Sequence, residues 1–174
     1  MDGVERKAHI VELLKRVNEA VTGSELAQQC GVSRQIIVGD ISILRAKGIP
    51  VISTPQGYQL IVDTRGSVDV LQRRIVCCHG PELVKKELET IVDNGGIIRN
   101  VGVEHHVYGF LEVELLLRSR RDIRRYIEQM KETKATLLSS ISHGVHTHLI
   151  EVDSEDDWQA ILAELNKMHI LLSE

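Results

Sequence analysis

The chain has few aromatic side chains, few cysteines and no long hydrophobic run. Phe, Trp and Tyr make up 3% of its 174 residues, so the core has to be built from aliphatic side chains. No apolar run approaches the roughly 20 residues that a membrane span requires, and the charged N-terminus lacks the apolar region of a signal peptide. The three cysteines, two of them adjacent, provide no disulfide framework. These absences predict a cytoplasmic protein that acts away from membranes.

Positive charge is also scarce, since the formal net charge is −4 at pH 7. The distribution is uneven: residues 1–62 hold 7 Lys and Arg against 6 Asp and Glu, a net of +1, whereas residues 63–174 hold 14 against 19, a net of −5. Nucleic-acid binding depends on local rather than total charge, so the acidic total does not exclude it. Any such binding is expected from the first 62 residues.

Residues 22–48 have the pattern of two short helices joined by a tight turn. Thr22 and Glu25 have the spacing of a capping box at the first helix, and Gly31 permits a sharp exit from it. Ser33 is a good N-cap for the second helix. The buried stripe of that second helix is expected to comprise Ile37, Ile41 and Leu44. The pattern predicts a helix-turn-helix.

The outer face of the second helix carries hydrogen-bond donors, one apolar side chain and a stretch of bare backbone. Groups of these kinds at the start of a helix suit contacts with base edges and phosphates in the major groove of DNA. The residues predicted to contact DNA are Ser33, Arg34, Gln35, Val38, Gly39, Ser42 and Arg45. The alternative is an ordinary helical hairpin whose polar face is solvated.

The segments on either side of this helix pair complete a winged helix. Residues 4–20 have the apolar spacing of an amphipathic helix. Residues 50–61 form two short apolar runs around a Pro-Gln-Gly turn, which predicts a β-hairpin. Residues 1–62 are therefore predicted to be a winged helix-turn-helix DNA-binding domain, and the polar residues 63–71 are predicted to be a linker.

Residues 72–174 alternate between strand-like and helix-like patterns. Strands are expected at residues 74–78, 97–103, 107–117 and 145–152, with a short additional strand at 136–141. Helices are expected at residues 81–94, at 119–132 and after Ser154. In the third strand the side chains expected to face inward are Val113, Leu115 and Leu117. The main order β-α-β-β-α-β-α predicts an α+β sandwich with helices on one face of a mainly antiparallel sheet.

Four residues of this second half have the types and spacing of a metal site. His146 and His148 point to the same face of an expected strand. His79 ends another strand, and Glu87 lies beside the buried stripe of the following helix, where an unpaired carboxylate is costly. If these elements converge, the side chains suit Ni, Zn, Fe or Cu in the divalent state. The alternatives are histidines scattered over the surface, and Cys77 as either a rival ligand or a core residue.

Three motifs of this half occur in order: RIVCCHGPELVKKELETIVDNGG at residues 74–96, HHVYGFLEVEL at 105–115 and HGVHTHLIEV at 143–152. Together they resemble the three-histidine domain of bacterial regulators, in which that domain follows a winged helix-turn-helix. The resemblance covers nearly the whole chain. It implies a transcriptional repressor of NAD biosynthesis and nicotinate salvage genes that binds operator DNA with nicotinic acid as corepressor.

The resemblance also implies that residues 72–174 form a metal- and ligand-sensing domain. The divalent metal, Ni or Zn, would be held by the residues that match the family motifs, which are His79, Glu87, His146 and His148. A homodimer is expected, because it sets two recognition helices about one turn of DNA, ~34 Å, apart.

The residues that would bind nicotinate are less clearly marked. Its carboxylate can coordinate a metal or pair with an arginine. Candidates near the connection between the second and third expected strands are Arg99, His105, His106 and Tyr108. An ordinary polar hairpin loop explains them equally well. The five arginines within residues 118–125 form either a solvated face or a contact for an anion or a DNA phosphate.

Two other functions compete with the repressor interpretation. A metal-dependent hydrolase joined to a DNA-binding module would use an open position on the metal. However, Glu87 as a ligand leaves no obvious general base, and neither G-x-S-x-G nor H-E-x-x-H occurs, so the chain is not expected to be an enzyme. In a metal-sensing repressor, the third candidate, the ion itself would be the signal.

Overall fold

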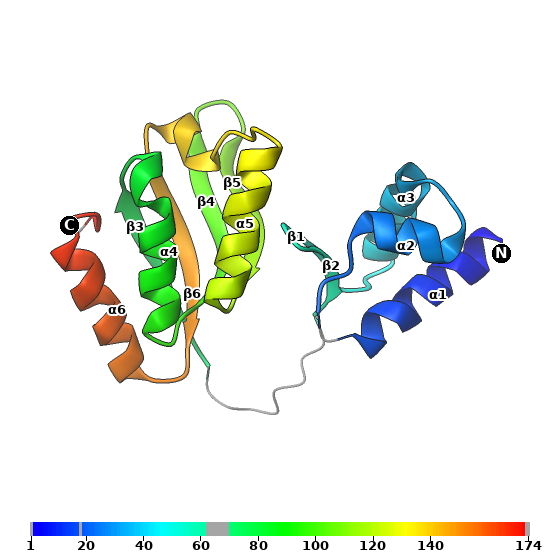
Figure 1. Cartoon of the computed structure of the whole chain (residues 1–174), viewed down its shortest axis with the longest axis horizontal. Coiled ribbons are helices and arrows are strands. Elements are labelled where there is room, and N and C mark those ends of the chain that lie inside the picture. Colours follow the sequence, from blue (N-terminus) through cyan, green and yellow to red (C-terminus); the bar gives the residue numbers. More distant parts are fainter. Residues whose placement is uncertain (1, 18, 62–69, 173–174) are drawn as a thin grey trace. The chain divides into compact units, whose positions relative to one another are not determined.

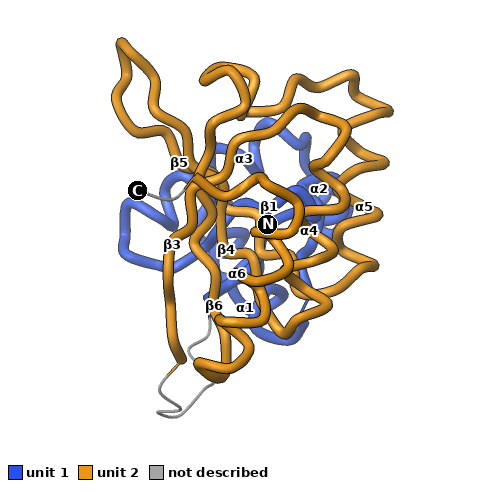
Figure 2. Tube along the Cα trace, turned by 90° about the vertical axis from the view of Figure 1, so that its left-hand side faces the viewer, with its two compact units in different colours: residues 1–66 blue, residues 67–174 orange. Residues whose placement is uncertain are grey.

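The chain divides into two compact units, residues 1–66 and 67–174 (Figures 1 and 2). The computed structural model describes residues 2–17, 19–61 and 70–172. Most of the predicted linker, residues 63–69, lies outside the described residues. Each unit has its own hydrophobic core. Among the described residues, no helix is both long and apolar enough to cross a membrane.

Unit 1, residues 1–66, has the α-α-α-β-β order of a winged helix. Its elements are α1 (Gly3–Arg16), α2 (Gly23–Cys30), α3 (Arg34–Ala46), β1 (Val51–Thr54) and β2 (Gly57–Leu60). β1 and β2 pair antiparallel and form the wing. The prediction of three helices and a hairpin is confirmed, although α1 ends at Arg16 rather than at residue 20.

Local capping explains where α2 and α3 begin and end. The hydroxyl of Thr22 accepts a hydrogen bond from the backbone N–H of Glu25 at 3.1 Å, and the Glu25 carboxylate accepts one from the N–H of Thr22 at 2.8 Å. Gly31 ends α2 with φ of 65°, a conformation that favours glycine. The hydroxyl of Ser33 caps α3 by accepting from the N–H of Ile36. The predicted capping box, turn and N-cap are therefore confirmed.

The core of unit 1 is aliphatic, with one buried carboxylate beside it. The buried apolar side chains are Ile10, Leu14, Leu26, Ala27, Cys30, Ile37, Ile41, Leu44, Val51 and Leu60. Asp40 on α3 is also buried, with 4% of its surface exposed. Arg6 and Lys7 on α1 place their cationic nitrogens 2.5 Å and 3.6 Å from its carboxylate oxygens. No sequence pattern indicated this ion pair, because 34 residues separate Arg6 from Asp40.

Unit 2, residues 67–174, is an α+β sandwich. Its four strands are β3 (Leu71–Cys78), β4 (Ile97–His105), β5 (Gly109–Leu117) and β6 (Val145–Val152). They form an antiparallel sheet in the order β3-β6-β4-β5. The helices α4 (Val84–Asp93), α5 (Arg120–Glu132) and α6 (Glu155–Lys167) cover one face of this sheet (Figure 1). The predicted fold class and element order are confirmed, with β3 starting inside the predicted linker at Leu71.

Two segments of unit 2 differ from the prediction. The helix predicted at residues 81–94 begins later than expected. Residues 81–83 form a separate short 3₁₀ helix, η1 (Pro81–Leu83), and α4 starts at Val84. The predicted strand at 136–141 is wrong, because this segment contains a second 3₁₀ helix, η2 (Leu138–Ser142). A strand at residues 136–141 would be expected to pair with β6, which follows it in the chain. Both edges of β6 are already paired, with β3 and β4, so that position is occupied.

Strand β5 interrupts its own alternation near its end. The pairing with β4 shifts between Ile98 and Asn100, and Leu116 has φ of 53°, as in a β-bulge that adds one residue to a strand. Leu115, Leu116 and Leu117 are all buried, whereas Val113 is 47% exposed. Val113 is the register partner of the core residue Val101, so it lies on the helix-covered face as alternation predicts, but that part of the face leaves it exposed.

Candidate metal centre

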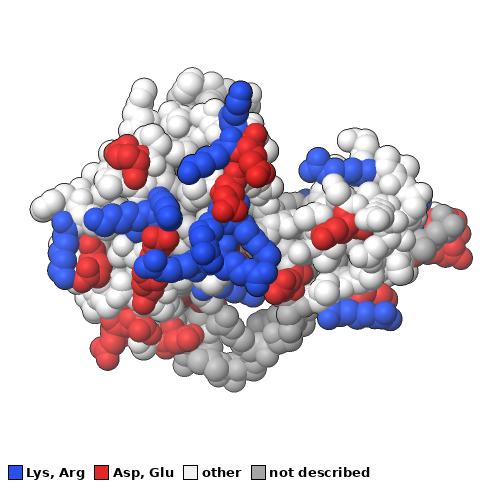
Figure 3. Space-filling view, in the orientation of Figure 1, with Lys and Arg blue, Asp and Glu red and all other residues white. Residues whose placement is uncertain are grey.

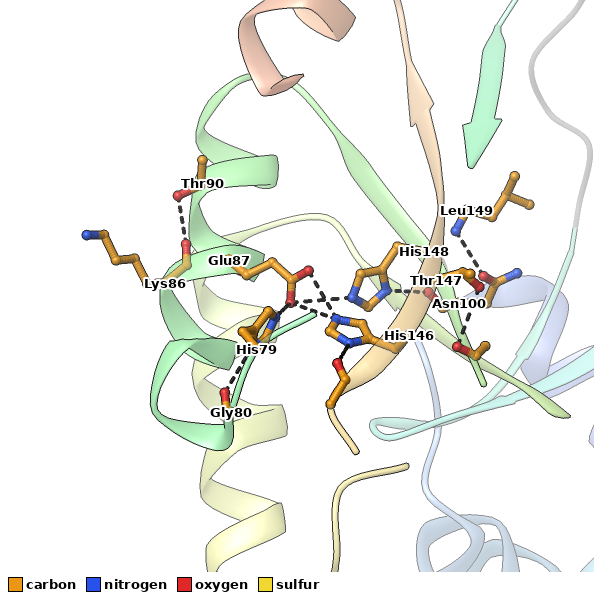
Figure 4. Close-up of polar contacts among 12 residues, drawn as sticks. His79, Gly80, Lys86, Glu87, Thr90, Asn100, His146, Thr147, His148 and Leu149 are labelled. Carbon is orange, nitrogen blue, oxygen red and sulfur yellow. Dashed lines mark hydrogen bonds and ion pairs between the residues drawn. The ribbon is translucent and has the colours of Figure 1, made fainter. Parts of the chain in front are cut away.

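Three elements bring the four predicted metal ligands together (Figure 4). His79 follows the end of β3, and Glu87 lies in the first turn of α4. His146 and His148 are alternate residues of β6, so both point to the face covered by the helices. The N–H of His79 donates to the carbonyl of Gly144 at 3.3 Å, which places the end of β3 beside the start of β6.

The carboxylate of Glu87 is the centre of this cluster. The Nε2 atoms of His79, His146 and His148 lie 2.7, 3.2 and 3.6 Å from its oxygens. Potential ligand atoms of His79, Glu87 and His146 all lie within 4.8 Å of one another, close enough for one ion. All four residues are buried, and Glu87 is only 1% exposed. The predicted convergence of two strands and a helix thus occurs.

Backbone carbonyls orient all three imidazoles. The Nδ1 atoms of His79, His146 and His148 lie 2.9, 2.8 and 2.7 Å from the carbonyl oxygens of Gly80, Gly144 and Asn100. A carbonyl can only accept, so each Nδ1 carries the proton and donates it. In a neutral imidazole this leaves the lone pair on Nε2, which faces the carboxylate. Two acceptors facing each other need a proton or a cation between them, and a metal ion meets that need for all three rings.

The electrostatics of the cluster favour a charged carboxylate despite its burial. Burial alone would raise the pKa of Glu87, but the charge of His148 and the hydrogen bonds with His146, His148 and His79 outweigh it and hold that pKa well below its usual value. Burial lowers the pKa of His79, yet its hydrogen bond to Glu87 and the carboxylate charge raise it overall. Glu87 is thus anionic in an otherwise apolar interior.

Cys77, the rival ligand, lies in the hydrophobic core and is fully buried. Burial, together with the negative charge of Glu87 and a hydrogen bond to it, raises the pKa of the Cys77 thiol. A metal ligand has to be the thiolate, so this environment favours the core role over the ligand role.

A small cleft opens beside the cluster. Glu87, His146 and His148 form its polar end, together with Ser139 of η2. Apolar side chains and one tyrosine form the remaining wall: Val84, Leu88, Val101, Leu115, Leu137, Leu138 and Tyr126. An apolar cleft with a few converging polar groups is the usual form of a small-molecule site. No feature of the linear sequence marked it, because its wall comes from five separate segments.

The candidate nicotinate-binding residues do not line this cleft. Arg99 follows the core residue Ile98 on β4 and forms an ion pair of 3.7 Å with Glu151. At the β4–β5 turn the His105 ring lies 4.7 Å from that of His106 and 4.8 Å from that of Tyr108. The Nδ1 atom of His105 also accepts hydrogen bonds from the backbone N–H groups of Val107 and Tyr108, as in a hydrogen-bonded hairpin loop.

The predicted DNA-contacting residues lie along the start and outer face of α3. All are exposed except Val38, which is half-buried. A side chain added at Gly39 would meet no atom within 4 Å, so the backbone is open to close approach there. Arg45 differs from the others, because it donates to the carbonyl of Val51 and the hydroxyl of Ser53 and so holds the wing. The prediction overlooked Ile36, a 42% exposed apolar residue on the first turn.

The arginine-rich run lies on α5 in unit 2. Figure 3 shows basic side chains, with acidic ones among them, over the region where α5 lies in Figure 1. Arg120 forms a two-point ion pair with Asp93 of α4, with nitrogen–oxygen distances of 2.8 and 2.5 Å. Arg121, Arg124 and Arg125 are exposed. At least one arginine of the run therefore joins two helices rather than serving a ligand.

Two known protein families match this chain, one in each of its two units. The HTH domain family matches residues 6–59, and the 3H domain family matches residues 72–174. The transcription repressor NadR of Bacillus subtilis (strain 168) is 36% identical over 172 residues, which is 99% of this chain and 96% of the relative. The probable transcription repressor NiaR of Thermotoga maritima is 38% identical over 170 residues, 98% of this chain and 95% of the relative. The protein therefore belongs to the family of transcription repressors in which an HTH domain precedes a 3H domain.

Proposed function

We propose that this protein represses genes of NAD biosynthesis or nicotinate salvage, with nicotinic acid as its corepressor and a divalent metal in unit 2. The observation that carries the proposal is the buried Glu87 carboxylate, which faces three imidazole Nε2 atoms beside an open cleft. A buried carboxylate that faces three imidazole nitrogens needs a proton or a cation between them, and one metal ion can take that place for all three rings. The names of both relatives support the repressor role.

His79, Glu87, His146 and His148 would hold the metal. Imidazole and carboxylate donors suit Ni or Zn better than Ca or Mg. The carbonyls of Gly80, Gly144 and Asn100 keep the three rings in the ligating tautomer. When bound, the ion supplies a positive charge at the polar end of the cleft.

Nicotinate would lie in the cleft, with its carboxylate toward the metal and its ring against the apolar wall. Leu88, Val101 and Leu115 give the ring a dry surface. Ser139 and Tyr126, which carry hydroxyl groups, line the same space. Nicotinamide has no carboxylate for the metal, so we expect it to bind more weakly. This cleft replaces Arg99, His105, His106 and Tyr108 as the proposed ligand site.

Operator DNA would be bound by unit 1 as part of a homodimer. Arg34, Gln35 and Ser42 would contact bases or phosphates, Val38 a thymine methyl group, and Gly39 would allow close approach. Ser33 caps the helix at that surface, and Arg45 acts by fixing the wing. Nicotinate would act by favouring the dimer geometry that fits two half-sites.

The test combines titration and DNA binding on the full chain. Calorimetry with nicotinic acid and nicotinamide, on Ni²⁺- or Zn²⁺-loaded and chelated protein, should show nicotinate binding that requires the metal. DNA from upstream of NAD biosynthesis genes should bind more tightly with nicotinate present. Arg34→Ala should weaken that binding about tenfold or more, whereas Arg16→Ala, an exposed arginine at the end of α1, should not.

Three outcomes would contradict the proposal. Unchanged DNA binding with nicotinate and with Arg34→Ala would remove the repressor mechanism. A response to metal alone would favour the metal-sensing repressor. Metal-dependent turnover of a hydrolase substrate would favour the enzyme alternative.

A further inference from the structure

Helix α5 carries two different kinds of side chain on its opposite sides. Ile123 is buried in the unit 2 core, and Tyr126 packs against that core. Arg121, Arg124 and Arg125 are exposed, and their i, i+3, i+4 spacing places them side by side on one face of the helix. We call these three residues the α5 arginine face. Figure 3 shows basic side chains gathered over the first half of α5, its lower end in Figure 1.

The charge of the α5 arginine face is not compensated. Arg120 forms an ion pair with Asp93, whereas the three arginines of the face form none among the residues that the structure describes. Glu128, an exposed residue one turn further along α5, therefore does not neutralise Arg124 or Arg125. Like charges at i, i+3 and i, i+4 destabilise a helix, and cations near its N-terminus oppose the macrodipole. An anion bound at this face would relieve both costs.

Unit 1 has few cations left for the phosphates of DNA. Arg6 and Lys7 are paired with the buried Asp40, and Lys15 pairs with a glutamate on α1. Arg45 holds the wing. The Lys and Arg residues of 1–62 that remain without such a partner among the described residues are Arg16, Arg34 and Lys47. DNA-binding proteins neutralise phosphates with Lys and Arg, so unit 1 alone has a modest electrostatic footprint.

We infer that the α5 arginine face binds phosphates of the DNA that unit 1 reads, as a second contact that does not depend on base sequence. The inference rests on the proposed function only in that the chain binds DNA. Guanidinium groups bind phosphate oxygens through two parallel hydrogen bonds. Arg121 and Arg125 lie about 6 Å apart along the helix axis, a length over which one DNA strand carries about two phosphates. Such contacts add affinity and fix orientation without reading bases.

The composition of α5 favours DNA over an anionic membrane. A basic helix that lies on a membrane also inserts apolar side chains among the lipids. All of α5 is described, and none of its large hydrophobic side chains is exposed, because its apolar side packs on the unit 2 core. A DNA backbone requires only positive charge and hydrogen-bond donors, which are what the α5 arginine face presents.

Helix α5 also contributes to the cleft beside the metal centre. Tyr126, the residue after Arg125, lines this cleft, and so does Ser139 of η2, the element that follows α5 in the chain. A ligand in the cleft would therefore contact the helix whose other side carries the arginines. This arrangement gives the proposed corepressor a path to DNA affinity that is one helix thick.

The salt dependence of DNA affinity, measured on the full, metal-loaded chain with nicotinate present, tests this contact. The variant combines Arg121→Gln, Arg124→Gln and Arg125→Gln, which removes three charges but keeps good helix formers. Fluorescence anisotropy measures affinity for two duplexes, one from upstream of NAD biosynthesis genes and one of unrelated sequence. Each lost phosphate contact reduces the steepness of log affinity against log salt by about 0.9. We expect a reduction of about 2 or more on both duplexes, and about fiftyfold weaker binding at about 100 mM salt.

The matched control removes the same charge elsewhere on unit 2. It combines Lys85→Gln, Lys86→Gln and Lys167→Gln, at exposed positions of α4 and α6, and should keep the wild-type salt dependence. Thermal melts and metal stoichiometry test whether each variant is folded and loaded. Sedimentation equilibrium tests whether each keeps the wild-type assembly, so that a changed slope reports on DNA contacts alone.

A wild-type slope in the arginine variant, or an equal reduction in the lysine control, would overturn the inference. So would loss of binding to phosphatidylserine vesicles with the DNA slope unchanged, which would point to a membrane instead. The two proposals fail separately. If nicotinate leaves DNA affinity unchanged but the arginine variant reduces the slope on both duplexes, the phosphate contact stands and the corepressor does not. If nicotinate tightens DNA binding and the slope is unchanged, the α5 contact falls alone.

Discussion

Each unit buries a carboxylate on a helix, and the two are satisfied in different ways. Asp40 in unit 1 is 4% exposed, and Glu87 in unit 2 is 1% exposed. Asp40 meets the permanent cation of Arg6 through two hydrogen bonds, with Lys7 close by. Glu87 meets three imidazoles whose other nitrogens already donate to carbonyls. The charge of Asp40 is compensated by cationic side chains of the protein itself, whereas the charge of Glu87 requires a bound proton or metal ion.

This difference separates a structural buried charge from a functional one. A buried ion pair with its own hydrogen bonds joins two elements and is costly only when it is broken. A buried charge whose neighbours are imidazoles, which can give up their protons, keeps an affinity for metal cations. Glu114 on β5 is a third case: its Oε2 atom is buried without a hydrogen-bond partner among the described residues. The three carboxylates therefore predict three different responses to mutation.

The largest expected effect is on metal binding. Glu87→Gln keeps the side-chain volume but removes the anion between the imidazoles, so we expect metal affinity to fall at least about 100-fold, the upper end of the loss for an outer-shell partner. Competition with a chromophoric chelator measures the affinity. The matched control is Asp40→Asn, which should bind metal as the wild type does. Equal affinity in Glu87→Gln would remove the carboxylate from the ligand set.

Loss of the Asp40 ion pair should destabilise unit 1 by about 3 kcal/mol, since breaking a buried pair leaves Arg6 uncompensated. Amide hydrogen exchange in α1 and α3 of Asp40→Asn measures the loss for this unit alone. Glu12→Gln breaks an exposed ion pair with Lys15 on α1 and should change stability by less than about 0.5 kcal/mol. If both variants behave alike, burial does not distinguish these two pairs.

Metal should stabilise unit 2 and leave unit 1 unchanged. A ligand present at 100 times its dissociation constant stabilises the folded state by about 2.7 kcal/mol. Trp158, the single tryptophan, is buried in the unit 2 core, so its fluorescence during urea unfolding reports on this unit. The added stability should be absent in Glu87→Gln. A shift of similar size in that variant would place the ion elsewhere.

The smallest expected effect concerns Glu114. Burial raises its pKa above the usual value, and the positive charge of Arg99 offsets this only in part. The folded state therefore binds more protons than the unfolded state between the two pKa values, and stability falls as pH rises through that interval. Glu114→Gln removes this loss and should stabilise unit 2 by about 1 kcal/mol at neutral pH. The gain should disappear below about pH 4; a gain that is independent of pH would contradict this cause.

Local patterns predicted most of the fold because their causes lie within a few residues. Thr22, Ser33, Ser119 and Ser154 each cap the helix that follows them, and such caps depend only on the next turn of backbone. The strands of unit 2 were predicted to within a few residues, apart from the segment now seen as η2. That segment failed because strand formation requires a free neighbour, which no local pattern reports.

The sequence predicted which residues form the candidate metal centre, but it predicted only part of their arrangement. Alternation along β6 places His146 and His148 on one face, and the apolar stripe of α4 places Glu87 beside it. The carbonyl of Asn100 that orients His148 lies 48 residues away, at a shift in strand register. The direction of that carbonyl depends on the path of β4, so no spacing rule could have identified it.

Sequence alone determined the order of elements, the caps and the set of ligand types, because these follow from the period of apolar residues and from hydrogen bonds across one turn. Only the tertiary structure decided which groups face Glu87, which arginine holds the wing and which side of the unit 2 sheet is covered by its own helices. These features arise where separate segments meet, and the free energy of each contact depends on both partners and on their burial.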